Sequence, residues 1–193
     1  MKVLVFENNC KISDQQQKNL PGWYILSDSS VTNTGKPFFL PEEYGRVTAS
    51  VGVAIKISRL GKGIAPGFAS RYYTQYAPVL QFHLPDFERK LQEEGRPADA
   101  SRNFDRALFT GDFIPYRETD IINLKNNGNI VREISFDNLV KGVDELISEV
   151  SVMNTMKIGD LIVAGISEAV EVREGDLLEV SVNGKDAFFV KIK

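Results

Sequence analysis

Cys10 and His83 carry side chains typical of enzyme active sites, and each is the only residue of its type in the chain. A thiolate beside an imidazole can act as a nucleophile, and both groups bind zinc. Two such residues cannot fill the four positions of a structural zinc site, and nothing around Cys10 marks a reactive thiol, so we interpret it as a small apolar filler. His83 lies in the apolar segment LQFHLP (80–85). Histidine there is more often a hydrogen-bonded structural residue, and the alternative is a general acid or base.

The composition is that of a soluble globular protein, and we expect residues 1–193 to form a single domain. The chain has 42% hydrophobic and 25% charged residues, an ordinary balance for a packed core. Its 23 basic and 26 acidic residues give a net charge of −3, which argues against nucleic acid as a partner. We find no apolar run of the ~20 residues that a membrane span needs and no signal peptide, so we expect no membrane partner and a cytoplasmic protein.

The segment 47–57 predicts a half-buried strand with an unusual second face. β-Branched residues occupy every second position from 51 onward, the period of a strand. The opposite face carries the small residues Ser50, Gly52 and Ala54. We therefore expect either close packing or a cavity against that face.

Helical spacing is clearest over residues 136–150, where Ser135 is placed to act as the N-cap. Two shorter helices are expected at 66–73 and 85–94. Each begins with a proline, which suits a first turn, and Gly95 closes the second.

Turn signals define the remaining strands. Gly-Asp pairs launch strands within 157–163 and 173–180, and Asn183-Gly184 turns the chain into a last strand, which predicts a C-terminal β-meander. A further hairpin is expected over 121–134, around an Asn-Asn-Gly-Asn turn. Strands, then a late helix, then strands again make α+β the fold class.

The C-terminal segments ISEVSVMNTMKIGDLIVAGI and VREGDLLEVSVNG resemble the end of the fumarylacetoacetate hydrolase family. Its members close a helix with a Gly-Asp phrase, a Thr-Gly-Thr-Pro turn and a second Gly-Asp strand. Earlier segments resemble family motifs in the same order: KPFFL (36–40), GKGI (61–64) and RNFD (102–105). The resemblance covers residues 36–193, and 1–35 form a divergent N-terminal segment.

This resemblance implies a mixed β-sheet roll with a few short helices, a homodimer, and an enzyme that cleaves, decarboxylates or isomerises acidic 2-oxo compounds and their enols. In the family, a magnesium, manganese or calcium ion holds the substrate. Two glutamates spaced Glu-x-Glu on one strand and a later aspartate supply the hard oxygen ligands that such ions prefer.

Ser50, Gly52 and Gln81 occupy the three positions that the resemblance assigns to these carboxylates. The small face of 47–57 therefore coincides with the family's glutamate pair, and we expect space where the two carboxylates would lie. Neutral serine and glutamine oxygens compensate poorly for the water that a divalent ion must lose. We expect no metal cofactor.

Other family positions also differ. Gly165 keeps the glycine of the Thr-Gly-Thr-Pro turn, but its neighbours lack both hydroxyls that would touch a ligand carboxylate. Arg102 stands in for a family lysine and offers either a bidentate carboxylate clamp or a structural ion pair. The family's N-terminal His-Glu pair has no counterpart, since Gln15 to Gln17 stand where that helix belongs.

Three functions remain open from the sequence. The first is a family fold without its metal chemistry, acting as a binding or structural module. The second is a divergent enzyme for a 2-oxo or enol acid, with His83 as acid or base and Arg102, Gln81, Ser50 and Gly165 binding the ligand. The third is a sensor of a small acid, or a structural partner of an intact family member.

Overall fold

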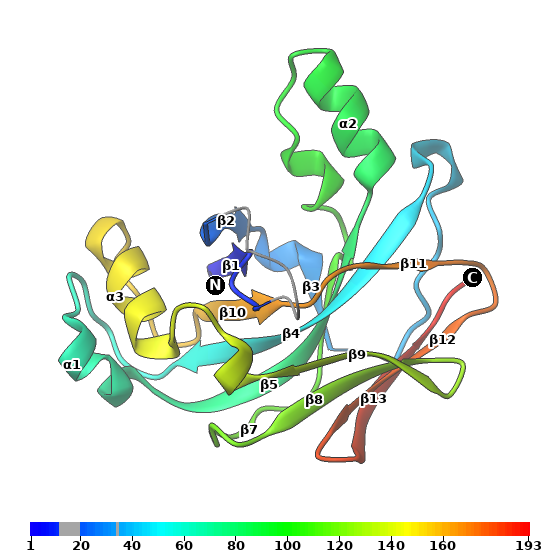
Figure 1. Ribbon diagram of the computed structural model, residues 1–193. Coiled ribbons are helices and arrows are strands. Elements are labelled where there is room, and N and C mark those ends of the chain that lie inside the picture. Colours follow the sequence, from blue (N-terminus) through cyan, green and yellow to red (C-terminus); the bar gives the residue numbers. More distant parts are fainter. Residues whose placement is uncertain (12–19, 34) are drawn as a thin grey trace.

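The computed structural model describes residues 1–11, 20–33 and 35–193. Their strands form two sheets (Figure 1). The larger sheet has nine strands in the order β2-β1-β10-β4-β5-β6-β3, with β11 added beside β4 and β7 beside β5. The smaller sheet is antiparallel, in the order β13-β12-β8-β9. The strands are β1 (Val3–Glu7), β2 (Gly22–Leu26), β3 (Val31–Thr32), β4 (Val47–Ile57), β5 (Tyr73–His83), β6 (Leu108–Thr110), β7 (Ile114–Pro115), β8 (Ile121–Asn126), β9 (Asn129–Ser135), β10 (Leu161–Ile166), β11 (Val170–Val172), β12 (Leu177–Val182) and β13 (Lys185–Lys191).

The larger sheet is mixed and curled into a half-barrel. β1 pairs with β10, and β3 with β6, in parallel; the other pairings are antiparallel. The main core lies where the two sheets face each other and combines residues of β4 and β5 with residues of β8 and β12. A second apolar cluster covers the other face, around Ala54, Val79 and Val163. The α+β class and the mixed β-roll expected from the sequence are therefore confirmed.

Three α-helices occur in the described part of the chain: α1 (Pro66–Ala69), α2 (Pro85–Glu93) and α3 (Val143–Met153). The predicted second helix is confirmed, and Gly95 follows it with φ +67°. The first predicted helix is shorter than expected, because a 3-10 turn over Ser70–Tyr72 leads directly into β5. Among the described residues, no helix combines the length and apolar character needed to cross a membrane.

The predicted start of the third helix is wrong. Ser135 precedes only a 3-10 turn, Phe136–Asn138, and α3 begins at Val143 after the N-cap Gly142. The intervening segment is held by Asn9, which is fully buried. The Asn9 carbonyl accepts a hydrogen bond from Val140 N–H, and its side-chain Oδ1 accepts one from Lys141 N–H. These bonds replace the helical ones, so the apolar spacing over 136–142 serves packing instead of a helix.

The prediction of a C-terminal β-meander is also wrong. β10 does not pair with β12 or β13. It lies in the larger sheet between β1 and β4, whereas β12 and β13 belong to the smaller sheet (Figure 1). The segment LIVAGI of β10 is apolar throughout and almost wholly buried, which suits a central strand covered on both faces.

The two Asn-Gly turns behave as expected. Asn127 and Gly128 have φ angles of +51° and +81°, and Asn183 and Gly184 have φ angles of +50° and +77°. Two successive positive φ angles are the geometry of the tight hairpin turn that Asn-Gly favours. Both hairpins, β8–β9 and β12–β13, are confirmed. The segment Gln15 to Gln17 lies outside the described residues.

Candidate functional site

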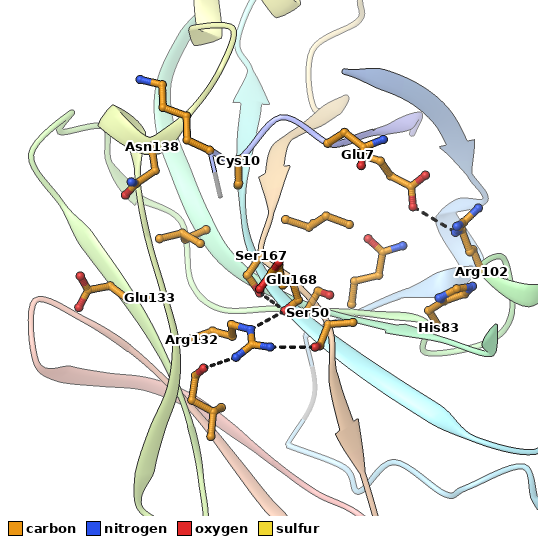
Figure 2. A pocket seen from close by; sticks show the side chains of 17 residues that line it. Glu7, Cys10, Ser50, His83, Arg102, Arg132, Glu133, Asn138, Ser167 and Glu168 are labelled. Atoms are coloured by element: carbon orange, nitrogen blue, oxygen red, sulfur yellow. Dashed lines mark hydrogen bonds and ion pairs between the residues drawn. The ribbon is translucent and has the colours of Figure 1, made fainter. Parts of the chain in front are cut away.

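A cavity of about 810 Å³ opens between the curled sheet and the β8–β9 hairpin (Figure 2). Three groups of residues line it. The first wall comes from the larger sheet and from the segments that follow β1 and the 3-10 turn Asp99–Ser101. β9 and the 3-10 turn Phe136–Asn138 supply the second wall, and the β10–β11 connection supplies the third. The residues are Glu7, Asn8, Cys10, Lys11, Ser50, Gln81, His83, Arg102, Val131, Arg132, Glu133, Ile134, Asn138, Ile166, Ser167, Glu168 and Ala169.

Strands β4 and β5 bring three predicted site residues together. Ser50 pairs in register with Gln81, and Thr48 pairs with His83. Because residues two apart on a strand share a face, Gln81 and His83 lie on the same side of β5, and both line the cavity. Ser50 lies beside them on the neighbouring strand. The sequence therefore identified one wall of the cavity.

Gly52 and Gly165 are packing positions and do not line the cavity. A Cβ atom at Gly52 would lie 2.6 Å from the Gly165 carbonyl oxygen, and one at Gly165 would lie 2.7 Å from Leu139 Cδ2. The space expected at Gly52 is therefore absent, because β10 approaches β4 there, with a shift in register between Val163 and Gly165. The small face of β4 combines close packing at Gly52 with an open cavity at Ser50.

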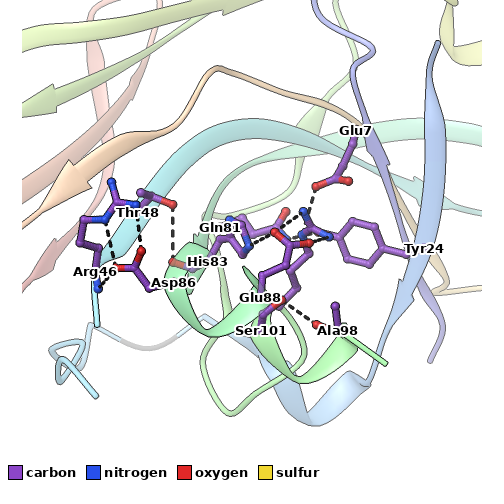
Figure 3. Close-up of polar contacts among 11 residues, drawn as sticks. Glu7, Tyr24, Arg46, Thr48, Gln81, His83, Asp86, Glu88, Ala98 and Ser101 are labelled. Atoms are coloured by element: carbon purple, nitrogen blue, oxygen red, sulfur yellow. Dashed lines mark hydrogen bonds and ion pairs between the residues drawn. The ribbon is translucent and has the colours of Figure 1, made fainter. Parts of the chain in front are cut away.

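Arg102 is held by two carboxylates in a charged cluster with Glu7, His83 and Glu88. Figure 3 labels these three partners together with Tyr24. Its Nε lies 3.2 Å from Glu7 Oε1, and its Nη1 lies 2.8 Å from Glu88 Oε1. The Arg102 guanidinium carbon also lies 5.5 Å from the centre of the Tyr24 ring. Its positive charge is therefore already compensated, which fits the structural alternative raised from the sequence.

His83 is the second partner of Glu88. Its Nε2 lies 2.9 Å from Glu88 Oε2. Burial, followed by the nearby Arg102 charge, lowers the pKa of His83 despite the opposing effect of Glu88. Burial is also the main reason that the pKa of Glu7 is raised. At neutral pH His83 is thus an uncharged imidazole in contact with a carboxylate, although the approach of Nε2 to Oε2 lacks the geometry of a hydrogen bond. An uncharged imidazole can accept a proton.

Cys10 lies at the edge of the cavity in a largely apolar environment. Burial raises the pKa of its thiol to about 12, so the reactive thiolate is scarce at neutral pH. Its sulfur also packs where a Gly165 Cβ would be, 2.9 Å from that position. This agrees with the interpretation of Cys10 as a filler.

Arg132 of β9 is a cavity residue that the sequence did not single out. Its guanidinium donates three hydrogen bonds to main-chain carbonyls: Nε to Glu168 at 2.9 Å, Nη1 to Val131 at 2.7 Å, and Nη2 to Ala169 at 3.1 Å. Figure 2 shows it on the opposite side of Ser50 from Arg102 and His83. These bonds orient the side chain without neutralising its charge.

Glu88 was also missed, although a local signal was present. It lies in the first turn of α2, five positions after His83, where the turn into a helix can bring its carboxylate back to the end of β5. No local sequence pattern indicated that Arg132 lines the cavity, because its position depends on how the β8–β9 hairpin packs against the β10–β11 connection.

The described residues contain no group of three or more His, Cys, Asp or Glu side chains placed to hold a metal ion. Ser50 and Gln81, which β4 and β5 contribute to the cavity wall, carry neutral side chains. Gln81 is 3% exposed and donates from Nε2 to the Tyr24 hydroxyl, while its Oε1 is buried without a partner in the described structure.

The family model of the fumarylacetoacetate hydrolase C-terminal region matches residues 4–190. The chain belongs to the fumarylacetoacetate hydrolase family. The match begins within the N-terminal segment for which the sequence offered no motif. None of the curated proteins compared with the chain matches it.

Solved structures of this family share the fold. Fumarylpyruvate hydrolase from Pseudomonas aeruginosa, in complex with Mn²⁺ and pyruvate, has a TM-score of 0.89 at 20% identity, with 100% of this chain and 89% of that chain covered. The 5-carboxymethyl-2-hydroxymuconate delta-isomerase from Mycobacterium smegmatis has a TM-score of 0.85 at 18% identity, with 99% and 78% covered. The relatives thus include hydrolases and isomerases.

Proposed function

We propose that this family member binds a small organic acid in its cavity without a divalent metal ion and without the family's metal chemistry. The observation that carries the proposal is the pairing of Ser50 with Gln81 in the β4–β5 register. These are two of the three positions where the family resemblance implies metal-binding carboxylates. The third, Gly52, has no room for a longer side chain in the present backbone.

The chemistry of these donors does not fit a hard divalent ion. Magnesium and manganese prefer several oxygen ligands with negative charge, because their hydration is costly to remove. The Ser50 hydroxyl and the Gln81 amide are neutral, and the Glu7 and Glu88 carboxylates are engaged with Arg102. Glu133 and Glu168 also line the cavity, but in the described residues neither belongs to a group of three side chains placed to hold a metal ion. A cavity with polar walls and positively charged side chains still suits a small anion.

Calorimetric titration tests the proposal directly. We expect Mg²⁺ and Mn²⁺ to give no heat of specific binding to the purified protein, and pyruvate to raise its melting temperature equally with and without EDTA. Micromolar binding of Mn²⁺, strengthened by pyruvate, would overturn the proposal. So would the failure of every small acid tested to bind.

A second candidate function is metal-free acid–base catalysis, which the contact between His83 and Glu88 favours. A neutral imidazole held by a carboxylate can remove a proton next to a carbonyl group. Keto–enol exchange of pyruvate, followed as loss of methyl protons to D₂O by NMR, tests it. We expect a protein-dependent rate that falls at least tenfold in His83→Gln, and an unchanged rate in that variant would exclude this role for His83.

A homodimer remains a prediction from the family resemblance, as does pairing with an intact family member. Light scattering coupled to size exclusion measures the first. A mass of twice 21.6 kDa would support the homodimer, and a single-chain mass at micromolar concentration would contradict it.

A further inference from the structure

We infer that the cavity selects a hydroxycarboxylate, with the ligand carboxylate on Arg132 and the ligand hydroxyl donating to Gln81 Oε1. This inference rests on the proposed binding of a small acid and adds the groups that recognise it. It replaces Arg102, the anion clamp suggested by the sequence, with a residue on another wall of the cavity.

The two arginines differ in what surrounds them. Arg102 faces Glu7 and Glu88 at salt-bridge distance, so two acidic groups oppose one guanidinium and the cluster attracts anions poorly. Arg132 forms no salt bridge with any carboxylate in the described ranges, and its guanidinium donates to the carbonyl oxygens of Val131, Glu168 and Ala169. Carbonyls orient a cation but leave its net charge intact.

Arg132 also retains donors for a ligand. A guanidinium has five N–H groups, and three are accounted for by the carbonyl oxygens. Its side chain is half-buried in the cavity wall, where solvent screening is weaker than on an open surface. Since the carbonyls hold it in place, less side-chain freedom is lost when an anion binds.

Gln81 supplies the second, independent observation. Its Oε1 is a buried acceptor with no hydrogen-bond partner in the described structure, and its residue lines the same cavity as Arg132. Leaving a buried carbonyl unpaired is costly, so a ligand that donates a hydrogen bond there is favoured. A hydroxyl group donates this bond, whereas the keto oxygen of a 2-oxo acid only accepts.

The other polar groups nearby do not provide a better site. The Ser167 hydroxyl accepts from Val51 N–H and donates to the Glu168 carbonyl, so it is already satisfied. Lys11 keeps its charge too, because its Nζ donates only to the Asp137 carbonyl among the contacts described, but its side chain is exposed, where solvent screens it more strongly than the half-buried Arg132. Together, the free charge of Arg132 and the unpaired acceptor of Gln81 describe a ligand that is an anion at one end and a hydrogen-bond donor elsewhere.

Three acids with the same carbon skeleton test the inference: lactate, pyruvate and propionate. Their dissociation constants are measured by calorimetry or ligand-observed NMR at constant ionic strength in EDTA. We expect lactate to bind about fivefold to tenfold more tightly than propionate, the range of one neutral hydrogen bond. Pyruvate should bind no better than propionate.

Variants separate the two contacts. Arg132→Gln should weaken all three acids by about tenfold or more, while Arg102→Gln should change them less. Gln81→Met, close in volume, should leave propionate unchanged and bring the lactate-to-propionate ratio near one. Because Arg132 also braces the β10–β11 connection, Arg132→Lys provides a second variant that keeps the charge, and it should bind lactate better than Arg132→Gln does. Thermal unfolding checks that each variant is folded.

The outcomes distinguish this inference from the proposed function. If none of the three acids binds the wild-type protein, the proposed function fails and the inference fails with it. If the acids bind but pyruvate is preferred, or if folded Arg132→Gln binds them as well as wild type, only the inference is overturned.

Discussion

Glu88 Oε2 lies 2.9 Å from His83 Nε2, and the same carboxylate accepts from Arg102 through both oxygens, from Nη1 at 2.8 Å and from Nη2 at 3.3 Å. One side chain of α2 therefore contacts both the only histidine of the chain and the half-buried guanidinium of Arg102. The single histidine makes this network easy to observe, because one imidazole resonance in the NMR spectrum reports it without ambiguity.

The first prediction concerns the pKa of His83. Burial and the Arg102 charge lower this pKa, and Glu88 raises it. Glu88→Gln should therefore lower the pKa further, and Arg102→Gln should raise it. An NMR titration of the His83 ring protons measures both, and Glu133→Gln, an exposed position, serves as the control with little effect. Movement of the two pKa values in the opposite directions would contradict the described contacts.

The second prediction concerns stability against acid. Because the pKa of His83 is lower in the folded state than its usual 6.5, the unfolded chain binds this proton more readily. This contribution to stability is complete above pH 6.5 and is lost as the pH falls from 6.5 toward the folded pKa, by at most about 1.4 kcal/mol per pH unit. Urea unfolding at several pH values should show a smaller loss over this interval in His83→Gln than in wild type. Equal losses in the two proteins would show that His83 does not contribute.

The third prediction concerns Asn9, a fully buried side chain. Its Nδ2 donates to the carbonyls of Ala164 and Lys141, and its Oδ1 accepts from Lys141 N–H. Asn9→Ala removes these partners and should lower the free energy of unfolding by about 2–4 kcal/mol, measured by chemical denaturation. The exposed Asn129→Ala should change it by no more than about 0.5 kcal/mol. A similar small effect at Asn9 would contradict its bridging role.

The fourth prediction concerns the close approach of β10 to β4. Gly52→Ala would place a methyl group 2.6 Å from the Gly165 carbonyl oxygen, and we expect a loss of about 1–3 kcal/mol in stability. Gly67→Ala is the matched control, because its Cβ would meet nothing within 4 Å and the position is helical. That variant should be neutral or slightly stabilising. Full tolerance of alanine at Gly52 would show that the strands can separate there.

The fifth prediction restores carboxylates to the β4–β5 wall. Ser50→Glu combined with Gln81→Asp places two acidic groups on residues paired in register, and these should create a measurable Mn²⁺ site, whereas we expect none in the wild type. Without metal the double variant should be less stable, because it buries like charges. Calorimetry and thermal shift with Mn²⁺ measure both effects, and equal Mn²⁺ binding by wild type would argue that other oxygens already form a site.

Local patterns in the sequence predicted much of the fold. The bounds of β4, the proline and glycine at the ends of α2, and the Asn-Gly turns each depend on residues close together in the chain, and each matches the structure. The half-buried character expected of β4 is wrong, because residues on both of its faces are buried. The start of α3 could not be predicted in this way. The backbone of 140–141 is captured by Asn9, more than 130 positions away, and no local spacing encodes that contact.

Only the part of the candidate site that lies on the paired strands β4 and β5 could be predicted from the sequence. Ser50, Gln81 and His83 were placed together correctly because β4 and β5 are adjacent in sequence and in space. The position of Arg132 in the cavity depends on how the two sheets pack together. The charge of Arg102 is compensated by Glu7 and Glu88, which come from two other elements. Tertiary contacts between distant segments thus decide which arginine remains available to a ligand.

The parallel pairing of β1 with β10 has a consequence for how the chain folds during synthesis. Val3 pairs with Leu161, and Lys2 forms an ion pair with Asp160 at 2.8 Å. A ribosome must therefore complete most of the chain before β1 can gain its neighbour in the centre of the sheet. Until then β1 can pair only with β2, and its other edge has no strand beside it. Such unpaired edges promote association with other chains. We expect nascent chains that stop before β10 to depend on chaperones, and full-length chains to be released from them once β10 emerges.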